Sequence, residues 1–236
     1  MSGLLGQFRR LPSRLAGPRA AAWWLSRFGG AGLLQPATVT SEDRHPELFD
    51  RVAALLVGVE APAILSFGCS TGEEVFTLAQ RFPTATVRGI DINPACIRAA
   101  RRSLAANPDP RLSFARADSA QGEPPASYDA IFALSVLRHG RLDAERPDDC
   151  SAILPFARFA AAVAVLDACL KPGGVLTIWG SHFRFADLPL AAHYDVIFSR
   201  AARSDLPVYG SDNRRLAEPG VEQIILSKPP GPPAHR

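Results

Sequence analysis

A glycine-rich loop at residues 68–72 (GCSTG) is the first segment of this sequence that could bind a ligand. It follows an apolar run of strand type and precedes an amphipathic helical pattern. Gly68 and Gly72 can adopt backbone angles that other residues avoid, so the main chain can approach a ligand closely. By itself, the loop predicts a binding site without naming the ligand.

Acidic side chains follow the next two predicted strands. Asp91, with Ile92 beside it, comes nineteen residues after Gly72, and a carboxylate there can accept hydrogen bonds from both hydroxyls of a ribose. Asp118 and Ser119 follow the third strand, where an acid could meet the exocyclic amine of adenine. A lone Asp at a strand end is more often a turn residue or a cap. Its occurrence together with the glycine loop favours ligand binding for Asp91.

Alternating strand and helix patterns supply the elements that must position these groups. Short apolar strands alternating with helices predict a parallel sheet covered on both faces, which binds ligands at the carboxyl ends of its strands. The expected fold is α/β, a Rossmann-like seven-stranded, mostly parallel sheet with helices on both faces. Long connectors are expected to form the walls and lid of the site at 117–127, 138–154 and 180–220. The predicted strands are 61–67, 85–90, 112–116, 129–134, 174–179 and 222–228, and the predicted helices are 73–82, 94–106, 155–170 and one capped by Ser41.

The glycine loop, the two acids and the turn at 170–174 (LKPGG) occur in an order that resembles the class I S-adenosylmethionine (SAM)-dependent methyltransferases over roughly residues 50–180. The run 68–74 (GCSTGEE) is also similar to the loop of the chemotaxis-receptor glutamate methyltransferases. Those enzymes carry an Arg-Asn pair after the fourth strand, where this chain has Ala133-Leu134-Ser135. The resemblance therefore supports the superfamily and not the receptor substrate.

The resemblance implies SAM as cofactor and a role for each motif residue. Ser66 stands where many of these enzymes carry an acid, and Ser70 replaces their middle glycine. The methionine part of SAM is expected on the loop 68–72, the ribose on Asp91, the adenine on Asp118 with Ser119, and the sulfonium above Leu134 and Ser135. The expected cofactor-binding residues are Gly68, Cys69, Ser70, Gly72, Asp91, Ile92, Asp118, Ser119, Leu134 and Ser135.

The methyl acceptor is not identified by the sequence, although an O- or N-acceptor on a small molecule is expected. His139 is the candidate general base, because its near-neutral pKa suits proton removal; an exposed loop histidine is the alternative interpretation. A carboxylate acceptor would need no base, and Arg138 could pair with it. Residues 180–185 are candidate acceptor contacts, and residues 209–215 could form part of a lid, with ordinary packing or a polar turn as the alternatives.

The charge of the chain is concentrated at one end. Residues 1–41 hold five arginines and no acid, which leaves 21 basic against 23 acidic residues elsewhere, so a nucleic-acid footprint on the main domain is not favoured. We expect a basic amphipathic arm at 1–40 and a SAM-dependent methyltransferase domain at 41–236. The arm could contact a membrane peripherally, act as a targeting peptide, or fold over the core. Widely spaced cysteines and the lack of a long apolar run predict a cytoplasmic protein without a metal site.

Two other functions compete with methyl transfer. A nicotinamide-dependent dehydrogenase would share the fold and Asp91, but its glycine motif needs glycines where this chain has Ser70 and Glu73. A non-catalytic binding or scaffold subunit is supported by Ser66 and by the absence of a convincing acceptor site. Titration with SAM, S-adenosylhomocysteine and NAD would separate the three.

Overall fold

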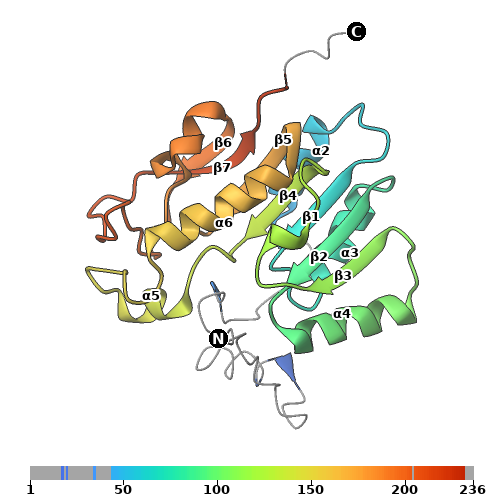
Figure 1. Ribbon diagram of the computed structural model, residues 1–236, viewed down its shortest axis with the longest axis horizontal. Helices are drawn as coiled ribbons and strands as arrows, with labels where there is room; N and C mark the ends of the chain where they lie inside the picture. Colours follow the sequence, from blue (N-terminus) through green and yellow to red (C-terminus); the bar gives the residue numbers. More distant parts are fainter. Residues whose placement is uncertain (1–16, 19, 21–33, 36–43, 204, 232–236) are drawn as a thin grey trace, which may run out of the picture.

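A seven-stranded sheet forms the centre of the computed structural model, which describes residues 17–18, 20, 34–35, 44–203 and 205–231 (Figure 1). The strand order is β3-β2-β1-β4-β5-β7-β6. The first five strands pair in parallel, whereas β7 is antiparallel to both β5 and β6. The strands are β1 (Ala63–Phe67), β2 (Thr86–Asp91), β3 (Leu112–Arg116), β4 (Tyr128–Leu134), β5 (Leu170–Trp179), β6 (Asp195–Ala201) and β7 (Val221–Ser227). This arrangement confirms the predicted fold class.

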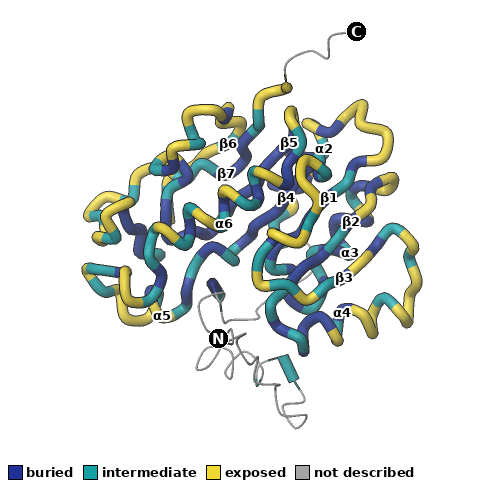
Figure 2. The backbone as a smooth tube through the Cα atoms, viewed as in Figure 1, coloured by how far each residue is buried: buried dark blue, intermediate teal, exposed yellow. Residues whose placement is uncertain are grey.

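Helices cover both faces of the sheet. On one face α6 (Phe156–Cys169) packs across the strands, as Figure 1 shows, and contributes Phe159, Val163 and Leu166 to the core. The other face is covered by α2 (Pro46–Leu55), α3 (Glu73–Arg81) and α4 (Pro94–Ala106). The central strands between these layers are buried, whereas the edge strand β6 is largely exposed (Figure 2). Burial on both faces explains why the parallel strands are apolar throughout.

Local sequence signals set the start of the helices next to the glycine loop. Gly72 has φ +100° and is the N-terminal cap of α3, a conformation that residues with a side chain rarely adopt. Asn93 caps α4, because its side-chain oxygen accepts hydrogen bonds from the backbone N–H of Ala95 and Cys96, and Pro94 follows it. Both helices therefore begin directly after the strand ends that carry the predicted site.

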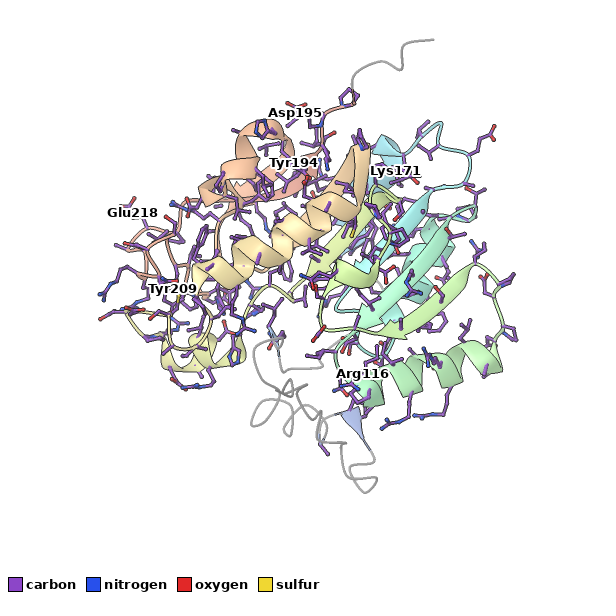
Figure 3. All side chains as sticks on the ribbon, in the orientation of Figure 1. Arg116, Lys171, Tyr194, Asp195, Tyr209 and Glu218 are labelled. Atoms are coloured by element: carbon purple, nitrogen blue, oxygen red, sulfur yellow. The ribbon has the colours of Figure 1, made fainter. Side chains whose placement is uncertain are left out.

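Strand register brings the three predicted loops to one edge. Phe67 of β1 pairs with Ile90 of β2, and Ser66 pairs with Phe132 of β4. The chain therefore leaves β1, β2 and β4 at the same level of the sheet. In Figure 3, Arg116 marks this carboxyl edge, and Lys171 marks the opposite edge, where β5 begins.

The long connectors contain regular elements that the sequence reading did not predict. Residues 180–220 hold the 3₁₀ helices η3 (Phe185–Asp187) and η4 (Pro189–His193) and the strand β6, which is the seventh strand of the sheet. Residues 138–154 hold α5 (Gly140–Glu145), and η2 (Ala120–Gly122) follows β3. The β6 region was missed because exposure on the edge removes the apolar pattern of a buried strand.

Two further details correct the predicted boundaries. The strand predicted from residue 174 begins at Leu170, so the 170–174 turn belongs to β5. His45 is the cap residue of α2, and the predicted cap Ser41 lies outside the described residues.

Candidate cofactor-binding site

One cavity lies at the carboxyl edge of the sheet, where the predicted loops meet. It holds about 690 Å³ of empty space, a figure that includes space open to solvent. Most of its wall comes from the segments that follow β1, β2, β3 and β4. The cavity is lined by Leu34, Gln35, Arg44, Phe67, Gly68, Cys69, Ser70, Glu74, Ile90, Asp91, Ile92, Ala117, Asp118, Leu134, Ser135 and Val136.

The glycine loop presents its backbone to this cavity. Gly68 has φ +81°, and a Cβ atom there would lie 2.5 Å from Val136 Cγ2, so no larger residue fits without movement. The N–H groups of Gly68 and Cys69 both donate to the carbonyl oxygen of Ile90. The loop is therefore anchored to β2 and held close to the segment after β4.

Asp91 lies beneath the loop and lines the cavity. Its Oδ2 accepts a hydrogen bond from the backbone N–H of Ser70 (2.9 Å), and its Oδ1 accepts one from the N–H of Asn93 (2.7 Å). Burial raises the pKa of Asp91, and these two backbone donors oppose the rise. A carboxylate has about four lone-pair positions, so Asp91 keeps capacity to accept from ligand hydroxyls.

The other predicted cofactor residues divide into two groups. Asp118, Ile92, Leu134 and Ser135 line the cavity together with the glycine loop. Ser119 does not line it, because its hydroxyl accepts from the N–H of Gln121 and caps η2.

Gly72 also lies outside the cavity wall. A Cβ atom at this position would lie 3.0 Å from both Ala100 and Phe114. Its role in the structure is close packing and the turn into α3.

Glu74 belongs to the motif at 68–74 and lines the cavity, although the motif by itself predicts no role for it. Its Oε1 accepts a 2.7 Å hydrogen bond from the hydroxyl of Ser66, the position where many related enzymes carry an acid. Burial raises the pKa of Glu74 to about 7, although Ser66 and the nearby Arg44 lower it. An acid in the first turn of a helix usually indicates only a favourable dipole interaction, so no sequence signal distinguishes Glu74 as a site residue.

Arg44 and part of the N-terminal arm also contribute to the wall of the cavity. Leu34 is buried in the core, and Gln35 and Arg44 line the cavity with it. Asn93 donates from Nδ2 to the carbonyl oxygen of Pro18 (3.1 Å). The described part of the predicted arm therefore contacts the site.

His139, the candidate base, is not brought to the cavity wall. It caps α5, and its Nδ1 accepts the N–H of Arg141 at 3.2 Å. That bond requires the tautomer with the proton on Nε2, which leaves no free lone pair to take up a proton. Burial also lowers the pKa of His139. Arg138, the candidate partner of a carboxylate acceptor, pairs with Asp143 instead.

The described residues contain no group of three or more His, Cys, Asp or Glu side chains placed to hold a metal ion. None of the helices that the structure describes is long and apolar enough to cross a bilayer. All four cysteines are buried free thiols.

Comparisons with known proteins agree with this geometry. Residues 65–176 match the family model described as a methyltransferase domain. Trans-aconitate 2-methyltransferase of Methylobacterium radiotolerans is 35% identical over 147 residues, which cover 58% of this chain and 48% of the relative. The enzyme of the same name from Variovorax paradoxus is 30% identical over 194 residues, covering 70% of this chain and 67% of the relative.

The similarity has a limited extent. The chain spans about half the length of the first relatives that it matches, at 48% and 49%. SAM-bound CalS10, an amino pentose methyltransferase from Micromonospora echinaspora, is 26% identical with a TM-score of 0.43, over 66% of this chain and 53% of that one. Given the family match, the relative of which two thirds is covered and the strand order, this chain belongs to the class I SAM-dependent methyltransferases.

Proposed function

We propose that this protein transfers the methyl group of SAM to a carboxylate oxygen of a small organic acid. The proposal has two parts, SAM as the methyl donor and a carboxylate as the acceptor. The first part rests on one cavity that is lined by the glycine loop together with Asp91, Asp118 and Glu74. The acceptor half is supported by the relatives, which are named for methylation of trans-aconitate. It is also supported by the position of His139, since an ionised carboxylate needs no general base.

The residues of the cavity fit the parts of SAM. Asp91 would accept hydrogen bonds from the ribose hydroxyls, and Asp118 would accept from the adenine amine. The methionine part of SAM carries an ammonium and a carboxylate. Glu74 would pair with the ammonium, and Arg44 would pair with the carboxylate. Glu74 would in this way supply the negative charge that Ser66 lacks. Leu134 and Ser135 would lie beneath the sulfonium.

The chemistry required of the protein is mainly alignment. When bound, SAM supplies an electrophilic methyl group on a positively charged sulfur. A carboxylate with an ordinary pKa near 4 is already a nucleophile at neutral pH. The protein must therefore hold the acceptor in line and exclude water, which would compete as a nucleophile.

Calorimetric titration with SAM, S-adenosylhomocysteine and NAD tests the cofactor assignment. We expect SAM and S-adenosylhomocysteine to bind. Asp91→Ala should lower the affinity for both about tenfold or more, because hydrogen bonds to a charged group are worth about 1.5–3 kcal/mol. Asp109→Ala is the matched control, since Asp109 also accepts a backbone N–H, from Arg111, but lies outside the cavity. Asp91→Asn, with a thermal unfolding curve, separates lost binding from lost folding.

The same titration distinguishes the competing functions. Preferential binding of NAD would replace the proposal with a dehydrogenase. Binding of none of the three ligands by folded protein would favour a scaffold subunit. Binding of SAM without methyl transfer to any carboxylic acid tested would contradict the acceptor half alone.

We infer a cytoplasmic location from the four free thiols, which persist in a reducing compartment. The peripheral membrane contact predicted for the arm falls largely on residues outside the described ranges, and it stays a prediction.

A further inference from the structure

Trp179, the last residue of β5, lies at the centre of a cluster of basic side chains. The His45 ring packs against it with ring centroids 4.1 Å apart. The guanidinium carbons of Arg200 and Arg203 lie 5.3 and 5.5 Å from its ring centroid. These residues come from the segment before α2, from β6 and from the segment after β6. The tertiary structure therefore assembles an aromatic and basic cluster that no contiguous motif announces.

The cluster borders the cofactor cavity at the sulfonium end. The N–H of Ser135 donates to the carbonyl oxygen of Trp179 at 2.6 Å, and a Cβ on Gly180 would meet Ser135 Oγ at 2.9 Å. On the other side, Arg44 lines the cavity and donates from Nε to Nε2 of His45 at 3.2 Å. A ligand beside Trp179 would therefore lie next to the cavity wall expected beneath the sulfonium.

Positive charge in this cluster is incompletely balanced. Glu222 is the acid nearest Arg200, but its Oε1 accepts the N–H of Gly180 at 2.7 Å, and its Oε2 stands 3.9 Å from Arg200 Nε. Among the residues that the structure describes, Arg200 donates no hydrogen bond, because 3.9 Å exceeds hydrogen-bond range. Arg203 pairs with Asp205 through two hydrogen bonds, and the Asp205 side chain is 60% exposed, so solvent screens this pair.

Three features show that the cluster can reach a ligand. The side chains of Arg200 and Arg203 are each 39% exposed. Arg203 and Glu222 also line a second pocket that is open to solvent, with Ser181 and Phe183 on its wall. In addition, the indole N–H of Trp179 is buried and has no hydrogen-bond partner among the described residues. Two planar guanidinium groups held beside an aromatic ring are suited to carboxylate recognition.

We propose that Arg200 and Arg203, held over Trp179, bind a second carboxylate of the acceptor and thereby select polycarboxylic acids over monocarboxylic ones. This inference rests on the proposed methyl transfer, and it assigns the specificity-determining residues for that reaction. One carboxylate of the acceptor is then the nucleophile beside Ser135, and the arginine pair holds another. Recognition by two guanidinium groups supplies the alignment that the transfer requires.

Calorimetric titration of the S-adenosylhomocysteine complex with trans-aconitate and with its trimethyl ester tests this inference. We expect the acid to bind the wild-type complex, and Arg200→Gln and Arg203→Gln each to weaken it at least tenfold. Arg200→Lys should restore part of the affinity, because it keeps the charge without the planar fork. Arg102→Gln, at an exposed position of α4, is the matched control and should bind like wild type.

Each result has a defined meaning. The affinity for S-adenosylhomocysteine should be the same in all variants, which shows that the fold is intact. Unchanged binding of the acid by both Gln variants would overturn the inference, as would equal binding of the triester or no binding of the acid by a wild-type complex. Failure of wild-type protein to bind S-adenosylhomocysteine would instead overturn the proposed function.

Discussion

At the scale of single residues, Asp91 and Glu74 are two acids in one cavity with different surroundings. The carboxylate of Asp91 accepts two backbone N–H groups, which stabilise its charged form. Glu74 accepts a single hydroxyl hydrogen bond, from Ser66, and burial raises its pKa to about 7. Glu74 should therefore change its charge near neutral pH, and the affinity for a ligand with an ammonium group should change with it.

The raised pKa of Glu74 leads us to expect that the affinity for SAM depends on pH. Between pH 6 and pH 7.5 the ionised fraction of a carboxyl with a pKa of about 7 rises roughly eightfold, and the apparent affinity for SAM should rise by about that factor. Calorimetry at several pH values measures it. In Glu74→Gln, binding should be weak and the slope should disappear.

Glu73→Gln provides the comparison for this experiment. Glu73 neighbours Glu74 in sequence, but its carboxylate accepts from the hydroxyl of Thr71 and does not line the cavity. This variant should keep the wild-type slope. A slope that persists in Glu74→Gln would rule out Glu74 as its source.

At the scale of elements, the glycine loop depends on how closely α3 approaches β2. Gly89 lies in β2 and pairs with Ser66 of β1. A Cβ at Gly89 would lie 2.8 Å from Cys69 Sγ, 2.8 Å from Val75 Cγ2 and 2.9 Å from Phe114 Cδ1. The absence of a side chain at this strand position lets the loop and α3 pack directly on the sheet.

Gly89→Ala should therefore destabilise the protein and disturb the loop together. Overpacking of a buried site costs about 1–3 kcal/mol, so we expect a lower midpoint of urea unfolding and weaker binding of SAM. Gly122→Ala is the control, because a Cβ there meets nothing within 4 Å. Equal unfolding midpoints for the two variants would contradict this expectation, because they would show that β2 can move away from α3 without loss of stability.

At the scale of the whole molecule, neutral histidines connect segments that are distant in sequence. His45, before α2, packs on Trp179 of β5, and burial beside Arg44, Arg200 and Arg203 lowers its pKa to about 4. His182 lies fully buried between the carbonyl oxygens of Pro207 and His139, and burial lowers its pKa as well. His45 thus joins the segment before α2 to the end of β5, and His182 joins the segments that contain His139 and Pro207.

The lowered pKa of His45 leads us to expect that the protein loses stability on mild acidification. Because its folded pKa lies below the ordinary 6.5, the unfolded chain takes up the proton first, so its contribution is present above pH 6.5 and is lost progressively toward pH 4. The raised pKa values of Glu74 and Glu222 act in the opposite direction. The informative quantity is therefore the difference between wild type and His45→Gln.

Thermal unfolding at pH 7.5, 6.5 and 5.5 measures that difference. The melting temperature of wild type should fall more on acidification than that of His45→Gln. His193→Gln, at an exposed position, should follow wild type. Parallel curves for wild type and His45→Gln would show that His45 takes up its proton equally in both states.

The sequence by itself determined the parallel core and the cofactor edge. Buried parallel strands must be apolar throughout, and loops at their carboxyl ends meet wherever the register aligns them. Order and spacing therefore predicted that Gly68, Asp91 and Asp118 lie at one site, and the family resemblance added Leu134. Strand β6 could not be predicted, because an exposed edge strand carries no such pattern.

Only the tertiary structure decided which predicted groups share the cavity. Ser119 and His139 are helix caps, because their side chains accept hydrogen bonds from the backbone N–H groups of Gln121 and Arg141. Glu74 and Arg44 became cavity residues through burial and packing, which depend on contacts between distant segments. The cluster around Trp179 is the clearest example, because its side chains come from three separate parts of the chain and meet only where β5 ends.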